Sequence, residues 1–317
     1  MAIREVTVFG GSGFVGRSVV RAFARAGARV RVAARRLAFV EATRTAGEVG
    51  QVVPVIANLR MPDSVRRAAE GSQVVVNAAG IPFQRLRQRY EAVHVAGAAA
   101  IAEAARAGGA ERVIHISGLG ADDRESRNPF IRSKVGAEGA IVAGFPRATI
   151  LRPSVVFGPD DAMFNRMARI ATTAPFLPLV GDGRARVQPI FVGDLAAAVV
   201  AAATRPETAG MVFELGGPRV FTYREIAALV LRQIGRDKPV IGVPAALMTI
   251  GGWLAEFLPV PPITADQVGL LTQDNVVRAG VPGLAELGVA PTSVEAILPT
   301  YLDRFRAGGR YNREAPI

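Results

Sequence analysis

Short runs of valine and isoleucine alternate with longer segments of helical periodicity through the first half of the chain. This pattern predicts strands at residues 3–9, 28–33, 52–56, 73–77, 112–116 and 148–151. It predicts helices at residues 14–26, 62–70, 88–107 and 130–143. Because strands that alternate with helices pair in parallel through right-handed crossovers, we expect an α/β, Rossmann-like fold on a doubly wound parallel sheet.

The pattern changes after Leu151, where proline and glycine become frequent. Segments 189–203 and 211–217 still read as parts of the main sheet region, whereas 222–235 and the chain from 245 onward indicate a smaller, mostly helical C-terminal lobe. We therefore expect a nucleotide-binding domain at 1–155, joined by 189–217. The expected substrate or partner lobe comprises 156–188 and 218–317.

The longest apolar stretch, residues 245–258, contains a single charge, Glu256. It is too short to span a bilayer, and Gly251 and Gly252 interrupt it. Its length favours a helix buried inside the smaller lobe. The alternative is an amphipathic helix that lies on a membrane or on a partner protein.

Composition excludes several classes of site. The chain has no cysteine, and its two histidines, His94 and His115, are too few for a zinc site, so we expect no metal and assign both to packing or hydrogen bonding. The formal net charge of +11 is spread along the chain without a nucleic-acid-binding module, so no nucleic-acid partner is expected. Met1 leads directly into the first strand without a secretory pattern, which predicts a cytoplasmic location.

A glycine-rich turn follows the first predicted strand and opens the first predicted helix: Gly10, Gly11, Ser12, Gly13, Phe14, Val15 and Gly16. Strand, glycine turn and helix in this order predict a dinucleotide site. The first glycine permits a tight turn, the middle one lets the backbone approach a pyrophosphate, and the last lets the helix pack against the strand. The helix N-terminus then offers N–H groups and a positive dipole end to the phosphates.

The end of the second predicted strand indicates which dinucleotide is bound. A NAD site normally has an acidic residue there, but this chain has Arg35 and Arg36, whose guanidinium groups suit a 2′-phosphate. We therefore expect NADPH to be preferred over NAD. Further expected cofactor-binding positions follow the later strands: Asn58, Leu59, Ala78, Ala79, Gly80, Ser117, Lys134, Pro153 and Val156.

The glycine turn, the sequence Asn77-Ala78-Ala79-Gly80, Ser117 and Lys134 together resemble the short-chain dehydrogenase/reductase superfamily. The stretches 115–122, 132–134, 148–159, 188–194, 214–218 and 297–302 are similar to one atypical family. That family contains the NADPH-binding accessory subunit of respiratory complex I, of the alpha-subcomplex subunit 9 type, and bacterial relatives. The resemblance extends over nearly the whole chain.

One departure from the family pattern bears on catalysis. The superfamily's catalytic tyrosine lies four residues before its lysine; here the lysine is Lys134, and the tyrosine's position holds Phe130. A phenyl ring has no proton to donate, and general acid catalysis contributes about 10²–10⁴-fold to rates. We therefore assign no catalytic residue, although Ser117 and Lys134 are retained. Whether Tyr90, which follows the fourth predicted strand, or another group substitutes for the missing tyrosine is left open.

The resemblance implies a non-catalytic, NADPH-binding accessory protein of respiratory complex I or of a quinone-linked membrane assembly. Such a protein would lie peripherally on the cytoplasmic face of the inner membrane. Two alternatives stay open. The first is a working NAD(P)-dependent reductase, epimerase or dehydratase, or a helper in ubiquinone biosynthesis. The second is a regulator whose partner binding depends on the NADPH level.

Overall fold

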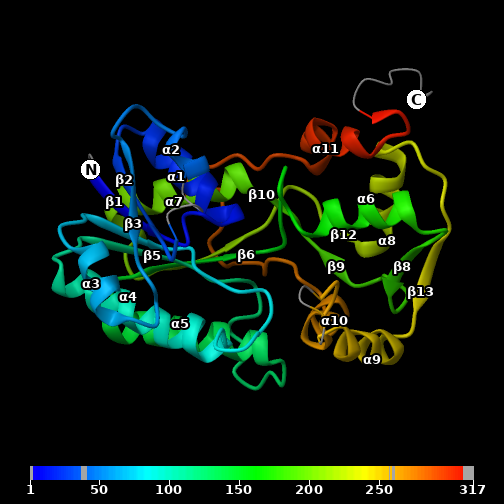
Figure 1. Ribbon diagram of the computed structural model, residues 1–317, viewed down its shortest axis with the longest axis horizontal. Coiled ribbons are helices and arrows are strands. Elements are labelled where there is room, and N and C mark those ends of the chain that lie inside the picture. Colours follow the sequence, from blue (N-terminus) through cyan, green and yellow to red (C-terminus); the bar gives the residue numbers. More distant parts are fainter. Residues whose placement is uncertain (1–2, 37–40, 257, 259–260, 310–317) are drawn as a thin grey trace. The chain divides into compact units, whose positions relative to one another are not determined.

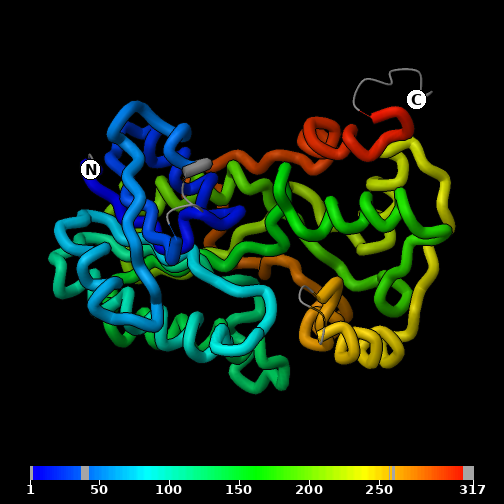
Figure 2. The backbone as a smooth tube through the Cα atoms, in the orientation of Figure 1, coloured from blue at the N-terminus to red at the C-terminus, as the bar shows by residue number. Residues whose placement is uncertain are grey.

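The computed structural model describes residues 3–36, 41–256, 258 and 261–309. Its contacts divide the chain into two compact units. The first comprises Met1–Pro153, Val192–Leu215 and Arg278–Ala290. The second comprises Ser154–Phe191, Gly216–Val277 and Pro291–Ile317, so the chain passes between the units several times along the trace in Figure 2. Whether these units correspond to a nucleotide-binding domain and a partner lobe stays a prediction.

A parallel sheet forms the centre of the first unit (Figure 1). Its strands are β1 (Glu5–Phe9), β2 (Arg29–Ala34), β3 (Val52–Ile56), β4 (Val74–Asn77), β5 (Arg112–Ile116), β6 (Thr149–Pro153) and β11 (Val212–Leu215). They lie in the order β11-β6-β5-β4-β1-β2-β3. The order reverses between β1 and β4, and in such sheets ligands bind at the carboxyl ends of the strands at this reversal.

Helices cover both faces of this sheet. They are α1 (Phe14–Arg25), α2 (Glu41–Arg44), α3 (Pro62–Ala69), α4 (Ala96–Ala107), α5 (Pro129–Gly144) and α7 (Val192–Thr204). Helices α3, α4 and α5 pack in series on one face, and α1 packs with α7 on the other (Figure 1). The small side chains of Ala98, Ala102 and Ala105 let α4 lie close to the sheet. The predicted α/β, Rossmann-like fold is confirmed.

One predicted helix differs from its expected form. Residues 88–107 were expected as one regular helix, but the segment starts with a π-helical turn at Glu91–Val95 before α4 begins. A π-turn inserts one extra residue per turn, so it shifts the side chains before it around the helix axis. Tyr90 and His94, at the start of this segment, are both buried, with their ring centroids 5.3 Å apart.

The second unit combines helices with pairs of short strands. The helices are α6 (Met163–Thr173), α8 (Tyr223–Gln233), α9 (Ala245–Ala255), α10 (Ala265–Leu271) and α11 (Val294–Leu302). The strand pairs are β7 (Val156–Phe157) with β10 (Ile190–Phe191), β9 (Arg186–Val187) with β12 (Phe221–Thr222), and β8 (Leu177–Val180) with β13 (Val240–Val243). Its core includes Phe157, Phe164, Ile226 and Leu298.

Helix α9 is exposed, which corrects the favoured interpretation of residues 245–258 as a buried helix. Only Gly252 is buried on it, whereas Leu247, Ile250, Trp253 and Leu254 are each 57–61% exposed. Length and apolar content did not separate a core helix from a surface helix, because nearly every position is apolar and the helix has no polar face. None of the helices in the described part of the chain has the length and apolarity needed to cross a bilayer.

Candidate nucleotide-binding site

The glycine turn has the backbone that a dinucleotide site needs. Gly10 has φ +78°, which favours glycine, and a Cβ there would lie 2.6 Å from the Ala78 carbonyl oxygen. A Cβ on Gly16 would lie 2.1 Å from the Gly10 carbonyl oxygen, so helix α1 approaches the turn as closely as backbone allows. Gly13 precedes α1 without a side-chain cap, which leaves the first N–H groups of the helix available to an anion.

The other expected cofactor positions of the first unit follow the strands of its sheet. Arg35 and Arg36 come directly after β2, and both are exposed. Asn58 follows β3; its side-chain oxygen accepts a hydrogen bond from the Arg60 N–H at 3.1 Å. Leu59 contacts helix α4, where a Cβ on Gly97 would meet its side chain at 3.0 Å.

The last two expected cofactor positions, Pro153 and Val156, lie in different units of the structure. Pro153 ends β6 in the first unit, whereas Val156 lies on β7 in the second unit. The assignment of all these residues to a cofactor stays a prediction. The topology does bring the carboxyl ends of β2, β3, β4, β5 and β6 to one edge of the sheet, which is where the sequence analysis expected the nucleotide.

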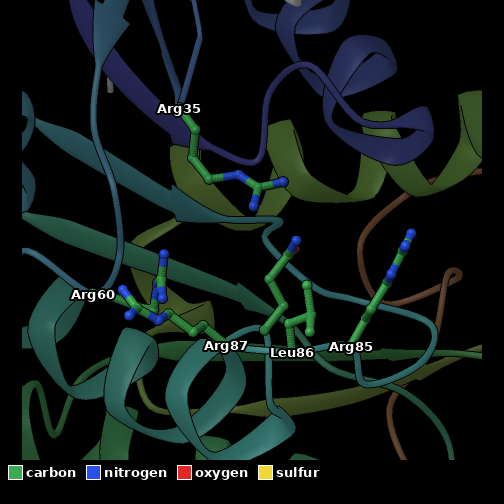
Figure 3. Close-up of a pocket in the computed structure, with 6 residues that line it drawn as sticks. Arg35, Arg60, Arg85, Leu86 and Arg87 are labelled. Atoms are coloured by element: carbon green, nitrogen blue, oxygen red, sulfur yellow. The ribbon is translucent and has the colours of Figure 1, made fainter. Parts of the chain in front are cut away.

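A pocket of about 620 Å³ lies beside the end of β2 (Figure 3). It is lined by Arg35, Arg60, Arg85, Leu86, Arg87 and Gln88. In Figure 3, Arg35 extends from the end of β2 and Arg60 from the segment after β3, whereas Arg85 and Arg87 extend from one further segment on either side of Leu86. The sequence analysis assigned only Arg35 of this set, together with Arg36, which does not line the pocket. Arg60, Arg85 and Arg87 were not assigned to the site, because nothing in their local sequence connects them to β2.

Helix α5 positions Phe130 and Lys134. Asn128 caps the helix by accepting hydrogen bonds from the N–H groups of Phe130 at 2.9 Å and Ile131 at 3.4 Å. The Lys134 ammonium lies 5.6 Å from the centre of the Phe130 ring. Burial lowers the pKa of Lys134 to about 8, although the nearby Glu138 carboxylate acts in the opposite direction.

Phe130 belongs to an aromatic cluster. Its ring contacts those of Tyr90 and His94 edge-on, with centroids 5.6 and 5.9 Å apart. The Tyr90 hydroxyl donates a hydrogen bond to the Pro82 carbonyl oxygen at 3.3 Å. This contact gives the Tyr90 hydroxyl a local structural role. The ring of Phe130 presents only C–H groups, and its assignment to the position of the family's catalytic tyrosine stays a prediction.

Both histidines make buried hydrogen bonds, as the sequence analysis expected. His94 Nε2 accepts from the Ile81 N–H at 3.0 Å, so its Nδ1 carries the proton toward Ser133 Oγ at 2.8 Å. His115 Nδ1 lies 3.0 Å from the Asn77 side-chain nitrogen. Burial lowers the pKa of each histidine to about 3, so both rings are neutral at physiological pH.

The end of β5 carries unsatisfied polar atoms. In the described part of the chain, the buried Ser117 Oγ and His115 Nε2 have no hydrogen-bond partner. Buried polar atoms normally have partners, so an orphaned hydroxyl at a strand end fits a ligand that completes it. The assignment of Ser117 to the substrate or nicotinamide side of a nucleotide site stays a prediction.

A buried charge network that the sequence analysis missed supports this end of the sheet. Arg152 on β6 makes two hydrogen bonds to the Glu138 carboxylate, at 2.9 and 2.6 Å, and its Nη1 lies 3.9 Å from Glu214 on β11. Arg278 pairs with Glu214 and Asp122 in turn. Because these residues are far apart in sequence, only the folded sheet brings them together.

The parallel sheet, the glycine turn and the uncapped helix N-terminus define a Rossmann-type dinucleotide-binding protein. Residues 6–216 match the model of the NAD dependent epimerase/dehydratase family, and the chain belongs to that family. This match confirms the resemblance to the short-chain dehydrogenase/reductase superfamily and the expectation of a family that binds nicotinamide nucleotides.

The chain is similar to two named proteins in sequence and to a solved structure in fold. It is 32% identical to the Arabidopsis thaliana protein named NADH dehydrogenase [ubiquinone] 1 alpha subcomplex subunit 9, mitochondrial, over 96% of this chain and 78% of that protein. It is 34% identical to the Caulobacter vibrioides ceramide reductase, over 78% of this chain and 76% of that protein. The structure of UDP-glucuronic acid 4-epimerase from Bacillus cereus with UDP-glucuronic acid and NAD superposes with a TM-score of 0.71. That match has 18% identity and covers 95% of this chain and 98% of that one.

Proposed function

We propose that this protein is a non-catalytic, NADPH-binding accessory subunit of a respiratory NADH:ubiquinone oxidoreductase of the complex I type. The observation that carries the proposal is Phe130. It occupies the family's proton-donor position on α5, one turn from Lys134, and its ring is packed against Tyr90 and His94. The relative named alpha subcomplex subunit 9 supports the assembly, because the similarity extends over nearly the whole chain.

The residues present fit a dinucleotide. The N–H groups after Gly13 would hold the pyrophosphate, where a Cβ on Gly10 or Gly16 would collide with backbone. Arg35 and Arg36 would favour a 2′-phosphate, Asn58 would lie near the adenine, and Lys134 would hold the nicotinamide ribose. When bound, the nucleotide supplies a hydride donor, but a carbonyl reduction also requires a proton. Phe130 has none to donate, so Lys134 and Ser117 would orient the ligand without completing a reaction.

A nucleotide in such a protein acts as a structural ligand. Binding that occurs only in the folded state stabilises that state by mass action, by about 2.7 kcal/mol at a hundredfold excess over the dissociation constant. The buried Ser117 hydroxyl, which has no hydrogen-bond partner in the described part of the chain, is consistent with a fold that a ligand completes.

Contact with a membrane-bound partner would involve helix α9. Its apolar side chains Leu247, Ile250, Trp253 and Leu254 are all more than half exposed, and soluble monomers seldom expose such a cluster. We assign the protein to the cytoplasmic face of the inner membrane, bound peripherally through this helix.

A second function is favoured by the relative named ceramide reductase. A working reductase, or a helper in ubiquinone biosynthesis, would retain Ser117 and Lys134 and require another proton donor. Tyr90 is the donor that the sequence suggested, but its hydroxyl already donates to the Pro82 carbonyl oxygen. A regulator that binds partners according to the NADPH level would use the same nucleotide site.

The deciding experiment is affinity purification of the tagged protein from gently solubilised membranes, with mass spectrometry of the proteins and of the nucleotide. Stoichiometric respiratory-complex subunits together with NADPH support the proposal. A protein that purifies alone and oxidises NADPH with a ketone substrate overturns it in favour of the reductase. Partner recovery that changes when NADPH is replaced by NADP⁺ favours the regulator.

A further inference from the structure

The arginine-lined pocket collects positive charge from three separate segments of the first unit. Arg35 follows β2, Arg60 follows β3, and Arg87 lies in the segment between β4 and the π-turn. All three side chains are exposed, and within the described residues none of them forms an ion pair with a carboxylate. The lining contains no acidic residue (Figure 3). These guanidinium groups are therefore available to an anion.

A tight turn holds the third segment in place. The Arg85 N–H donates to the Gln88 carbonyl oxygen at 3.0 Å, and the Gln88 N–H donates to the Arg85 carbonyl oxygen at 2.8 Å. Leu86 between them has φ +49°, in the left-handed region that residues other than glycine rarely adopt. In this turn Arg85 and Arg87 both line the pocket.

The charge on the pocket matches one kind of ligand group. A phosphomonoester carries about 1.5 to 2 negative charges at neutral pH and three acceptor oxygens, so one arginine does not neutralise it. The pyrophosphate of a dinucleotide would lie at the glycine turn that follows β1. Strand β2 is the neighbour of β1 in the sheet. A phosphomonoester on the adenosine ribose would therefore lie on the β2 side of the site, beside Arg35.

We propose that Arg60 and Arg87 act with Arg35 as a clamp for the 2′-phosphate of the bound nucleotide. On this basis the turn at Arg85–Gln88 determines cofactor specificity. The inference rests on the proposed nucleotide function and extends it, since the motif at the end of β2 accounts for Arg35 and Arg36 but not for Arg60 or Arg87. Arg89 offers a matched control, because it is exposed in the same segment but does not line the pocket.

The test measures binding of NADPH, NADH, 2′,5′-ADP, 5′-AMP and inorganic phosphate by calorimetry. The proteins are the full-length wild type and the variants Arg35→Ala, Arg60→Ala, Arg87→Ala and Arg89→Ala. We expect Arg60→Ala and Arg87→Ala each to weaken NADPH and 2′,5′-ADP binding about tenfold, because each removes a charge-assisted contact. NADH and 5′-AMP binding should change by less than about twofold, and Arg89→Ala should match the wild type.

The outcomes separate this inference from the proposed function. If Arg35→Ala alone removes the preference for the 2′-phosphate, the clamp is wrong and the NADPH-binding role stands. If the wild type binds NADH as tightly as NADPH, both the clamp and the NADPH preference are wrong. If the wild type binds inorganic phosphate as tightly as 2′,5′-ADP, the pocket is a free-phosphate site and the clamp is overturned. Because these arginines are exposed, their substitution should not change the stability of the fold. Equal melting temperatures of the variants and the wild type without ligand will verify this.

Discussion

Phe130 shows how one residue changes the chemistry that a shared fold supports. The ring lies on α5 with the Lys134 ammonium 5.6 Å from its centre, next to Tyr90 and His94. The scaffold around it retains Ser117 and Lys134, but the group that would transfer a proton is missing. General acid catalysis by such a group contributes about 10²–10⁴-fold to the reaction rate. On the proposed function, this single difference separates a nucleotide-binding subunit from a reductase.

Phe130→Tyr tests this interpretation directly. The wild type should not consume NADPH with a panel of ketones that includes long-chain 3-oxo lipids, whereas the variant should show slow turnover, because its phenol lies beside Lys134. Loss of absorbance from the reduced nicotinamide is the measurement, and Phe130→Leu is the control. Turnover by the wild type that equals or exceeds that of the variant would show that another proton donor is present.

Lys134 gives the folded protein a distinctive pH dependence. Burial lowers its folded-state pKa to about 8, below the ordinary lysine value of 10.5. Between these values the unfolded chain binds more protons than the folded one, so the free energy of unfolding rises with pH from about 8 to 10.5. Below pH 8 the full cost of burying the ammonium is present. The groups that face it in the structure are Glu138 and the neutral His94 and His115.

Lys134→Met should remove this rise. We expect wild-type stability relative to the variant to increase by an amount on the order of 3 kcal/mol between pH 8 and 10.5, measured by urea unfolding at several pH values. Lys238→Met, which removes the chain's other lysine, is the control. Identical pH slopes for wild type and Lys134→Met would show that the ammonium is not buried in solution.

At the scale of elements, the backbone of helix α1 packs directly against the backbone of the glycine turn. Gly16→Ala would bring a methyl group 2.1 Å from the Gly10 carbonyl oxygen, so the helix must move. We expect a loss of at least about 1–3 kcal/mol of stability, the range for overpacking, together with loss of nucleotide binding.

Gly139→Ala on α5 is the matched control for Gly16→Ala. A Cβ there meets no atom within 4 Å, so the same substitution should stabilise the protein by roughly 0.5–1 kcal/mol through helix propensity. Chemical denaturation of both variants measures the contrast. Equal effects at the two positions would mean that α1 does not pack against the turn as closely as described.

At the scale of the whole molecule, the exposed apolar surface of α9 predicts an assembly. Trp253, the chain's single tryptophan, lies on this helix and is 58% exposed. In the isolated protein its fluorescence should be quenched by iodide. In the presence of the native membrane fraction it should shift to shorter wavelength and become protected, because docking buries the indole.

Substitutions on α9 should weaken the same association. Ile250→Ser combined with Leu254→Ser is expected to release the protein from membranes during sedimentation. Val142→Ser, at an exposed apolar position on α5, should leave it bound. Equal retention of both variants would place the contact elsewhere on the molecule.

Most of the fold was predictable because its signals are local. A few consecutive residues are enough to recognise a strand rich in valine and isoleucine, a helix of regular period or the glycine turn between them. The expected strands and helices of the first half lie where they were predicted, apart from the π-turn at Glu91–Val95. The expected roles of the histidines in hydrogen bonding were also correct. The burial of α9 was predicted wrongly, since an almost wholly apolar helix has no periodic signal to show which surface it faces.

The sequence by itself determined the fold class, the position of the glycine turn and the absence of a tyrosine at Phe130, because each depends on residue type at short spacing. Only the tertiary structure decided which arginines share a pocket, since Arg35, Arg60 and Arg87 come from three segments that the parallel sheet brings to one edge. The same is true of the lowered pKa of Lys134 and of the network around Arg152. Desolvation and charge pairing depend on what surrounds a group in space, and neighbours in sequence do not specify it.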